Sequence, residues 1–263
     1  MSDLVLDFFG FSHLPFSKLL APKQLFCTQA FKEAFSGLLW GIPTEDLMLV
    51  SGPVGCGKSV LVGALMRELD PNTYVPLYVR GHNLSEGELY KTVLAALDQP
   101  APHFAHTAKQ MFFRLLPQNS KKPVVVIDDA QESREGALLA LKSMCNFDSD
   151  SRSRITFILC GQPELKATLK LAPFLPVRQR IRLFFQMEAM SLEETCQYID
   201  HHTKIAGKPT SLFADGAKAE IFRHTEGIAR RVNFICFRSI LNAAMNGIQV
   251  IDSKNLVLDE LSD

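Results

Sequence analysis

The sequence predicts an α/β fold: a five-stranded parallel sheet covered by helices on both faces, followed by a small all-α C-terminal region. Two observations support this fold class. Short apolar runs alternate with stretches of helical spacing over the first two thirds of the chain, and beyond residue 190 only helical spacing remains. Alternation of this kind is typical of parallel sheets, whose strands need long crossover connections and are buried on both faces.

The strands are predicted from apolar runs too short for helices. Five such runs occur: Leu47–Ser51, Tyr74–Val79, Val124–Asp128, Ile155–Cys160 and Arg182–Met187. The segments between them include apolar residues at helical spacing, as in Val60–Leu69, Ser85–Leu97 and Arg134–Met144. We therefore expect strand and helix to alternate up to Met187.

The C-terminal region begins with a helix-start signal. Ser191-Leu-Glu-Glu194 fits a capping box and predicts a helix to about Ala206. Asp215 is expected to cap a second helix, residues 228–246 form a third, and a short fourth is expected from Asp252. The predicted division is an α/β domain at residues 1–189, including an N-terminal segment 1–30, and a helical lid at residues 190–263.

Composition indicates a folded protein with no membrane anchor. Hydrophobic residues make up 47% of the 263 positions, and 28 basic residues balance 28 acidic ones, so a polyanion would have to be held by a local patch. The six cysteines form no C-x-x-C pair and are expected to be reduced. No run approaches the roughly 18 apolar residues of a membrane span, and the acidic start lacks the basic region of a signal peptide. We expect a cytoplasmic protein.

The segment Gly52-Pro-Val-Gly-Cys-Gly-Lys58-Ser59 fits G-x-x-x-x-G-K-[ST], the phosphate-binding loop of nucleoside triphosphatases. It lies between a predicted strand and a predicted helix, where such a loop must lie. Glycines let successive N–H groups point at one anion, Lys58 would reach the β- and γ-phosphates, and the Ser59 hydroxyl would ligate Mg²⁺. The candidate ATP-binding residues are Gly52, Pro53, Val54, Gly55, Cys56, Gly57, Lys58, Ser59 and Val60. The alternative is a glycine-rich turn before a core helix.

Two carboxylates end the third predicted strand. Asp128 is the candidate on the metal side, holding Mg²⁺ together with Ser59, and Asp129 is the candidate base that orients the attacking water. The alternative is a solvated strand end before a turn. Pairing with the phosphate loop favours the catalytic interpretation.

With these motifs in place, the chain resembles the AAA+ ATPases, and specifically their ExeA-like branch. Six blocks carry the resemblance over nearly the whole chain: Phe8–Ser17, Gly52–Ser59, Val126–Gln131, Gly161–Leu165, Arg178–Ile181 and Gly227–Arg230. It implies a homo-oligomer, ring or filament, in which an arginine acts on the nucleotide of a neighbouring subunit.

The resemblance also implies roles for single residues. Gln162 corresponds to the sensor-1 residue near the γ-phosphate, Arg178 or Arg180 to the arginine finger, and Arg230 to the sensor-2 arginine of the lid. The aromatic block Phe8–Phe16 corresponds to the segment near the adenine. The alternatives are solvated surface arginines and plain core packing of the aromatic residues.

The chain differs from the ExeA-like family at the candidate catalytic base. ExeA-like proteins commonly have Asp-Glu where this chain has Asp128-Asp129, so the base is one methylene shorter. A carboxylate about an ångström out of place can cost on the order of a hundredfold in rate. Hydrolysis is therefore expected to be slow or stimulated by a partner, and Glu132, beyond the strand tip, is a disfavoured substitute.

Three functions fit such an ATPase. The first is a transposition helper that binds double-stranded DNA and a transposase, selecting the target and regulating the transposase. It is favoured by local likeness around residues 187–207 and by the chain ending after the lid, where ExeA proper continues into a transmembrane helix. The alternatives are an ExeA-like secretion ATPase and a nucleotide-dependent scaffold with little turnover.

Clusters of cationic or histidine side chains give little further support for DNA binding or for a metal site. The candidate cations for DNA are Lys121, Lys122, Arg152, Arg154, Lys166 and Lys170, and such groups are more often solvated faces. Two histidine pairs, at 103 and 106 and at 201 and 202, lack the further ligands of a metal centre, so we expect no zinc site.

Overall fold

The computed structural model describes residues 2–17, 24–100, 102–146, 153–208 and 211–258. Their contacts group the chain into two compact units. An α/β unit comprises Gln29–Pro53 and Lys58–Met187, and a helical unit comprises Met1–Thr28, Val54–Gly57 and Glu188–Asp263.

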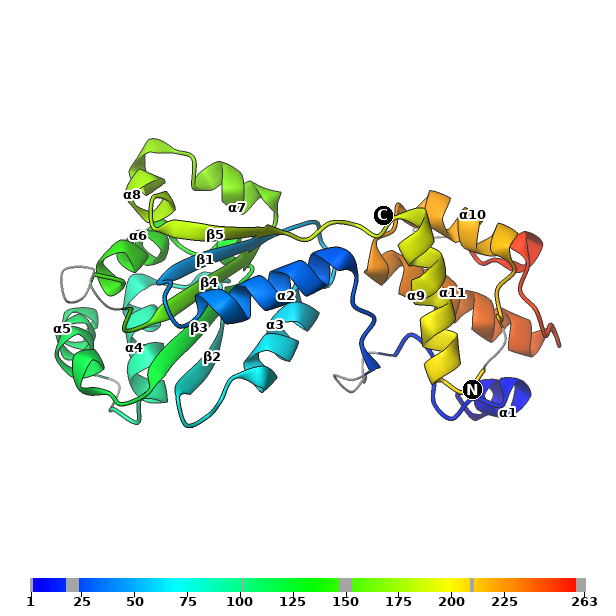
Figure 1. Cartoon of the computed structure of the whole chain (residues 1–263), viewed down its shortest axis with the longest axis horizontal. Coiled ribbons are helices and arrows are strands. Elements are labelled where there is room, and N and C mark those ends of the chain that lie inside the picture. The colour runs from blue at the N-terminus through cyan, green and yellow to red at the C-terminus, as the bar shows by residue number, and fades with distance from the viewer. Residues whose placement is uncertain (1, 18–23, 101, 147–152, 209–210, 259–263) are drawn as a thin grey trace. The chain divides into compact units, whose positions relative to one another are not determined.

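The α/β unit contains one five-stranded parallel sheet with the order β2-β3-β4-β1-β5 (Figure 1). Its strands are β1 (Leu47–Ser51), β2 (Tyr74–Arg80), β3 (Lys122–Asp128), β4 (Thr156–Gly161) and β5 (Ile181–Gln186). This confirms the predicted fold class and all five strands, with ends that shift by one or two residues. Because the strands are parallel, the phosphate loop after β1 and the carboxylates after β3 lie at the same edge of the sheet.

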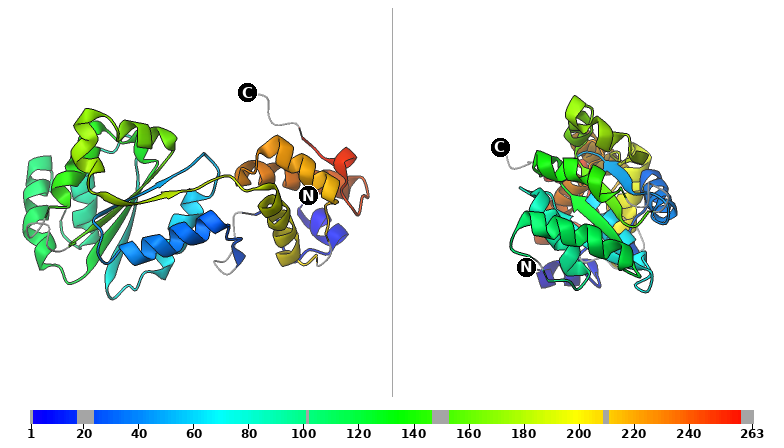
Figure 2. Two further views of the ribbon diagram at one scale, coloured as in Figure 1. Left: turned by 45° about the horizontal axis from the view of Figure 1, so that its top comes forward. Right: turned by 90° about the vertical axis from the view of Figure 1, so that its left-hand side faces the viewer.

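Helices cover both faces of this sheet. They are α2 (Gln29–Gly41), α3 (Lys58–Glu68), α4 (Glu86–Ala96), α5 (Ala105–Leu115), α6 (Glu135–Met144), α7 (Pro163–Thr168) and α8 (Leu175–Arg178), with 3₁₀ turns η2 (Leu116–Gln118), η3 (Ala130–Glu132) and η5 (Ala172–Phe174). Helices α2 and α3 contact each other, and α4 contacts α5 and α6. The right-hand view of Figure 2 shows α2 in blue on one side of the sheet and the green and teal helices on the other.

The alternating side chains of the strands build a core on each face. Leu49, Val125 and Phe157 belong to a large apolar cluster that includes residues of α4, α5 and α6. Their neighbours Met48 and Val126 are also fully buried, although they point to the opposite face. Burial on both faces explains why the strands are continuous apolar runs.

The helical unit contains α1 (Ser2–Phe9), α9 (Leu192–Ile205), α10 (Asp215–Thr225), α11 (Ala229–Met245) and a 3₁₀ turn η6 (Ser253–Asn255). The capping box at Ser191 and Glu194 is present as predicted. Asp215 is not the cap that we expected: Ala214 holds the N-cap position, and Asp215 lies in the first turn, 3.5 Å from the Lys218 ammonium.

The N-terminal segment packs with the helical unit, whereas we expected it to accompany the α/β domain. Phe9, Phe11 and Phe16 are buried in the apolar core that α9, α10 and α11 share. The Ser12 N–H donates to the Ala206 carbonyl over 2.7 Å. These aromatic residues pack against apolar side chains of the three helices, and this packing is why the N-terminal segment belongs with the helical unit.

Within the described ranges, the helices are all too short or too polar to span a bilayer.

Candidate nucleotide-binding site

The phosphate loop leaves β1 at Gly52, whose N–H donates to the Gly161 carbonyl of β4 over 3.2 Å. Gly55 and Gly57 have φ angles of +82° and +100°, in the region that a side chain disfavours. Helix α3 begins directly afterwards at Lys58. The loop therefore combines a tight turn with the N-terminus of an eleven-residue helix, which is the arrangement that binds phosphate.

Lys58 is buried although it carries a charge, with only 7% of its surface exposed. Its ammonium donates to the carbonyls of Gly52 at 2.7 Å and Pro53 at 2.8 Å. The charge is thereby held inside the loop, where it would face an anion. Such a position fits the predicted role with the β- and γ-phosphates.

Ser59 and Asp128 come together from α3 and β3. The Ser59 hydroxyl donates to Asp128 Oδ2 over 3.0 Å, and the Asp129 N–H donates to Asp128 Oδ1 over 3.1 Å. A hydroxyl beside a carboxylate is an oxygen donor set of the kind that Mg²⁺ takes. These residues would hold the ion, as the sequence predicts.

Tyr78 is a member of this site that the sequence analysis missed. Its hydroxyl donates to Asp128 Oδ2 over 2.7 Å from the neighbouring strand β2. Burial, together with this hydrogen bond to Asp128, raises the pKa of Tyr78 to about 12, so the hydroxyl stays protonated at neutral pH. The pairing register of β2 and β3 is what could have revealed this contact. Tyr78 lies opposite Val126, two residues before Asp128.

Asp129 is exposed and has a left-handed backbone, with φ at +50°. Its Oδ1 accepts a hydrogen bond from Gln131 Nε2 over 3.2 Å. Gly81 lies so close that a Cβ added there would be 2.3 Å from the Asp129 carbonyl oxygen. The candidate base is therefore fixed by its turn and by two neighbours that the sequence analysis did not single out.

Gln131 also connects the base to Gln162. The Gln162 backbone N–H, at the start of α7, donates to Gln131 Oε1 over 3.1 Å. The structure thus brings Asp129 and Gln162 to one place, with Gln131 between them. Glu132 is held elsewhere, since its carboxylate lies 2.9 Å from His82 Nδ1, and this agrees with its rejection as a substitute base.

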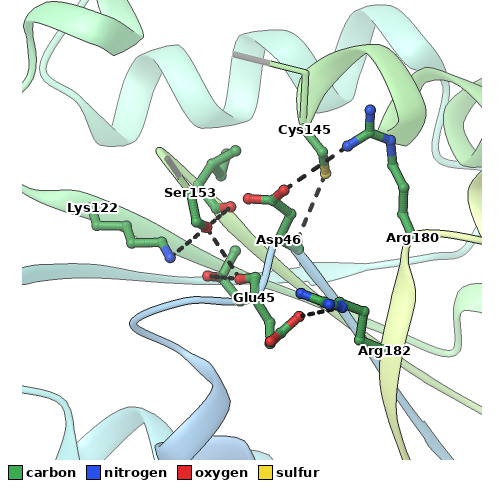
Figure 3. A network of polar contacts seen from close by, with 9 residues as sticks. Glu45, Asp46, Lys122, Cys145, Ser153, Arg180 and Arg182 are labelled. Atoms are coloured by element: carbon green, nitrogen blue, oxygen red, sulfur yellow. Dashed lines mark hydrogen bonds and ion pairs between the residues drawn. The ribbon is translucent and has the colours of Figure 1, made fainter. Parts of the chain in front are cut away.

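The two candidate finger arginines differ in their surroundings. Arg178 ends α8 and is exposed. Arg180 is largely buried and lies 4.0 Å from Asp46, while Arg182 lies 3.9 Å from Glu45 (Figure 3). Asp46 and Arg180 come directly before β1 and β5, so this network lies at the amino ends of the strands. It is the sheet edge opposite the chain's own phosphate loop.

Arg230 lies in the first turn of α11 with an exposed side chain. Its backbone N–H donates to the carbonyl of Gly55 over 3.2 Å, and Gly55 belongs with the helical unit. A Cβ on Gly55 would be 2.7 Å from the Cβ of Arg230, so this approach requires glycine.

Lys122 is not available to DNA as we expected. Its ammonium donates to the Ile42 carbonyl and the Ser153 hydroxyl, each over 2.6 Å (Figure 3). Burial lowers the pKa of Lys122 to about 8. Lys121 donates to the Pro71 carbonyl, Lys166 lies over the Phe184 ring, and Arg152 lies outside the described residues. Of these predicted cations, Lys122 is the one that the structure shows to be buried and engaged by the protein's own oxygens.

Residues 43–169 match the family model described as an AAA domain. The chain contains an AAA domain. A longer relative supports this assignment: general secretion pathway protein A of Aeromonas hydrophila is 27% identical over 249 residues. The match covers 92% of this chain but 45% of that protein, so the chain spans less than half the length of this distant homologue.

Solved structures show that the AAA domain and the following helices have the AAA+ fold. The Aeropyrum pernix ORC2 protein, in its ADPNP-ADP complexes, superimposes with a TM-score of 0.67 at 17% identity, over 91% of this chain and 69% of that one. Cdc6p from Pyrobaculum aerophilum gives 0.66 at 18%, over 94% and 68%. The RuvB Holliday junction branch migration motor of Thermotoga maritima gives 0.60 at 16%, over 88% and 67%. The predicted family resemblance is confirmed.

Proposed function

We propose that this protein binds Mg·ATP at residues 52–60 and hydrolyses it, with Asp129 as the base. The observation that carries the proposal is the convergence of the buried Lys58 ammonium with the Ser59 and Asp128 oxygens at one sheet edge. An AAA domain implies nucleotide binding. Bound Mg²⁺ would neutralise charge on the phosphates.

The residues of the chain divide the remaining work. Lys58 and the N-terminus of α3 hold the β- and γ-phosphates. Asp129 accepts the proton of the attacking water, and Gln131 keeps its carboxylate in place. Gln162 contacts the γ-phosphate, and Arg230 contributes charge from the lid. Because aspartate is shorter than glutamate, we expect slow turnover until a partner tightens the site.

We further propose that Arg178, rather than Arg180, is the finger in a homo-oligomer. Arg178 is exposed, whereas Arg180 is largely buried and paired with Asp46. An arginine finger must be exposed so that it can contact the nucleotide of a neighbouring subunit. Its position at the edge opposite its own phosphate loop supports an action on another subunit's nucleotide.

For the biological role, we propose an ATPase of a secretion-type system, related to general secretion pathway protein A. The 27% identity, over 92% of this chain, supports this role over the transposition helper, for which Lys122 is not available to DNA. The alternative of a nucleotide-dependent scaffold with little turnover remains, because the candidate base Asp129 is one methylene shorter than glutamate. DNA, a transposase and the Phe8–Phe16 adenine contact stay predictions.

Substitutions of Asp129 test the hydrolytic proposal. Asp129→Asn removes the base and should lower ATP turnover by about a hundredfold with ATP affinity retained. Asp129→Glu lengthens the carboxylate and should raise turnover. The measurement is phosphate release at saturating Mg·ATP, with ATP affinity measured alongside. Background turnover in the wild type and in both variants would favour the scaffold.

Binding to random-sequence duplex DNA at about 0.1 M salt separates the biological roles. The secretion-type proposal predicts no binding with ATP, with ADP or without nucleotide. Binding that requires ATP, with rings or filaments on DNA by electron microscopy, would overturn it in favour of the transposition helper.

A further inference from the structure

We propose that Tyr78 is a positioning residue for the magnesium site, a role that rests on the proposed Mg·ATP binding. Its hydroxyl holds the Asp128 carboxylate in the orientation in which Asp128 and Ser59 present oxygens to the ion. Tyr78 thus acts through Asp128 and does not itself ligate metal or contact nucleotide.

The hydrogen bonds around Asp128 lead to this assignment. Oδ2 accepts from the Tyr78 hydroxyl at 2.7 Å and from the Ser59 hydroxyl at 3.0 Å. Oδ1 accepts from the Asp129 N–H at 3.1 Å. A hydroxyl has two lone pairs besides its proton, so Ser59 can ligate a metal while it still donates to Asp128. Tyr78 and the Asp129 N–H are the donors that fix the carboxylate without themselves ligating the metal.

The neighbouring strand offers no second donor for this task. Arg80 lies directly opposite Asp128 in the β2–β3 ladder and is exposed. Among the described residues, its guanidinium makes no ion pair with Asp128. Tyr78 lies two residues earlier on the same face, and its longer reach brings the phenol hydroxyl to the carboxylate.

Replacement of the hydroxyl alone tests the role. Tyr78→Phe should weaken ATP binding about threefold to tenfold in the presence of Mg²⁺, since a hydrogen bond to a charged group is lost at a half-exposed position. ATP binding in EDTA should be unchanged. Tyr74→Phe, on the same strand but at its other end, is the matched control. Titration calorimetry with ATP gives both affinities, and thermal unfolding reports whether the variant is folded.

A double-substitution cycle adds a test of mechanism. In an Asp128→Asn background, Tyr78→Phe should change the Mg²⁺-dependent affinity no further, because its target is already altered. Equal losses with Mg²⁺ and in EDTA, or no loss in either, would overturn the positioning role. Failure of the wild type to bind ATP in both conditions would instead refute the proposed function.

Discussion

At the scale of single residues, two adjacent carboxylates have different environments. Asp128 is buried and accepts hydrogen bonds from three donors, whereas Asp129 is exposed on a left-handed backbone. A rigid carboxylate suits an ion, and an accessible one suits an attacking water. Gln131 is the side chain that restrains Asp129.

Removal of this restraint should slow the reaction. Gln131→Ala leaves Asp129 in place but frees its carboxylate, so turnover should fall about tenfold while ATP affinity stays unchanged. Gln118→Ala, at an exposed position of η2 in the same unit, should have no effect. Both values come from steady-state phosphate release and equilibrium binding. Equal rates in the Gln131 variant and the wild type would show that the bond has no part in hydrolysis.

At the scale of elements, the end of β2 supports the turn that carries the base. The Gly81 N–H donates to the Asp128 carbonyl over 2.7 Å, and a Cβ at Gly81 would press on the Asp129 carbonyl. The Asp129 carbonyl belongs to the backbone, so it cannot move away from a Cβ at position 81 without displacing the turn.

Gly81→Ala should therefore destabilise the α/β unit by about 1–3 kcal/mol and lower turnover. Gly136→Ala, in the first turn of α6, is the control, since a Cβ there meets nothing within 4 Å. Chemical denaturation gives the free energy of unfolding. Wild-type stability and turnover in the Gly81 variant would contradict the close contact.

Some elements and site residues could be predicted from the sequence, and others could not. The strands were predictable because they are buried on both faces and read as apolar runs, and the phosphate loop and carboxylates because their motifs are local. Tyr78 and the Asp46 partner of Arg180 were not, since each depends on strand order, and Gln131 was not, since its bond to Asp129 depends on the conformation of the turn after β3. Helix α5 was not singled out, although its apolar residues recur at helical spacing and Ala108 and Phe112 are buried.

At the scale of the whole molecule, each unit has its own apolar core, so the two can differ in their response to acid. His202 is buried in the helical unit, stacked on Phe16 with ring centroids 4.9 Å apart and close to Tyr198. Burial, with smaller contributions from His201 and His13, lowers the pKa of His202 to about 4.

Acid should weaken the helical unit first. Above pH 6.5 the histidine is neutral in both the folded and unfolded states. Between pH 6.5 and 4 only the unfolded chain takes up the proton, so the free energy of unfolding should fall by about 3 kcal/mol over this range. His202→Phe should remove most of this dependence, and His106→Gln, at an exposed position, should keep it. Thermal unfolding at pH 7.5 and pH 5 provides the comparison.

We propose that the loop at residues 52–60 binds ATP through Lys58. The most direct test is titration calorimetry of Mg·ATP against the wild type, Lys58→Ala and Lys142→Ala, in which the control removes an exposed lysine of α6. We expect the wild type and the control to bind alike and Lys58→Ala to lose binding at least a hundredfold, since the buried ammonium would face the phosphates of a bound nucleotide. Equal affinity in all three proteins would contradict the account of this site.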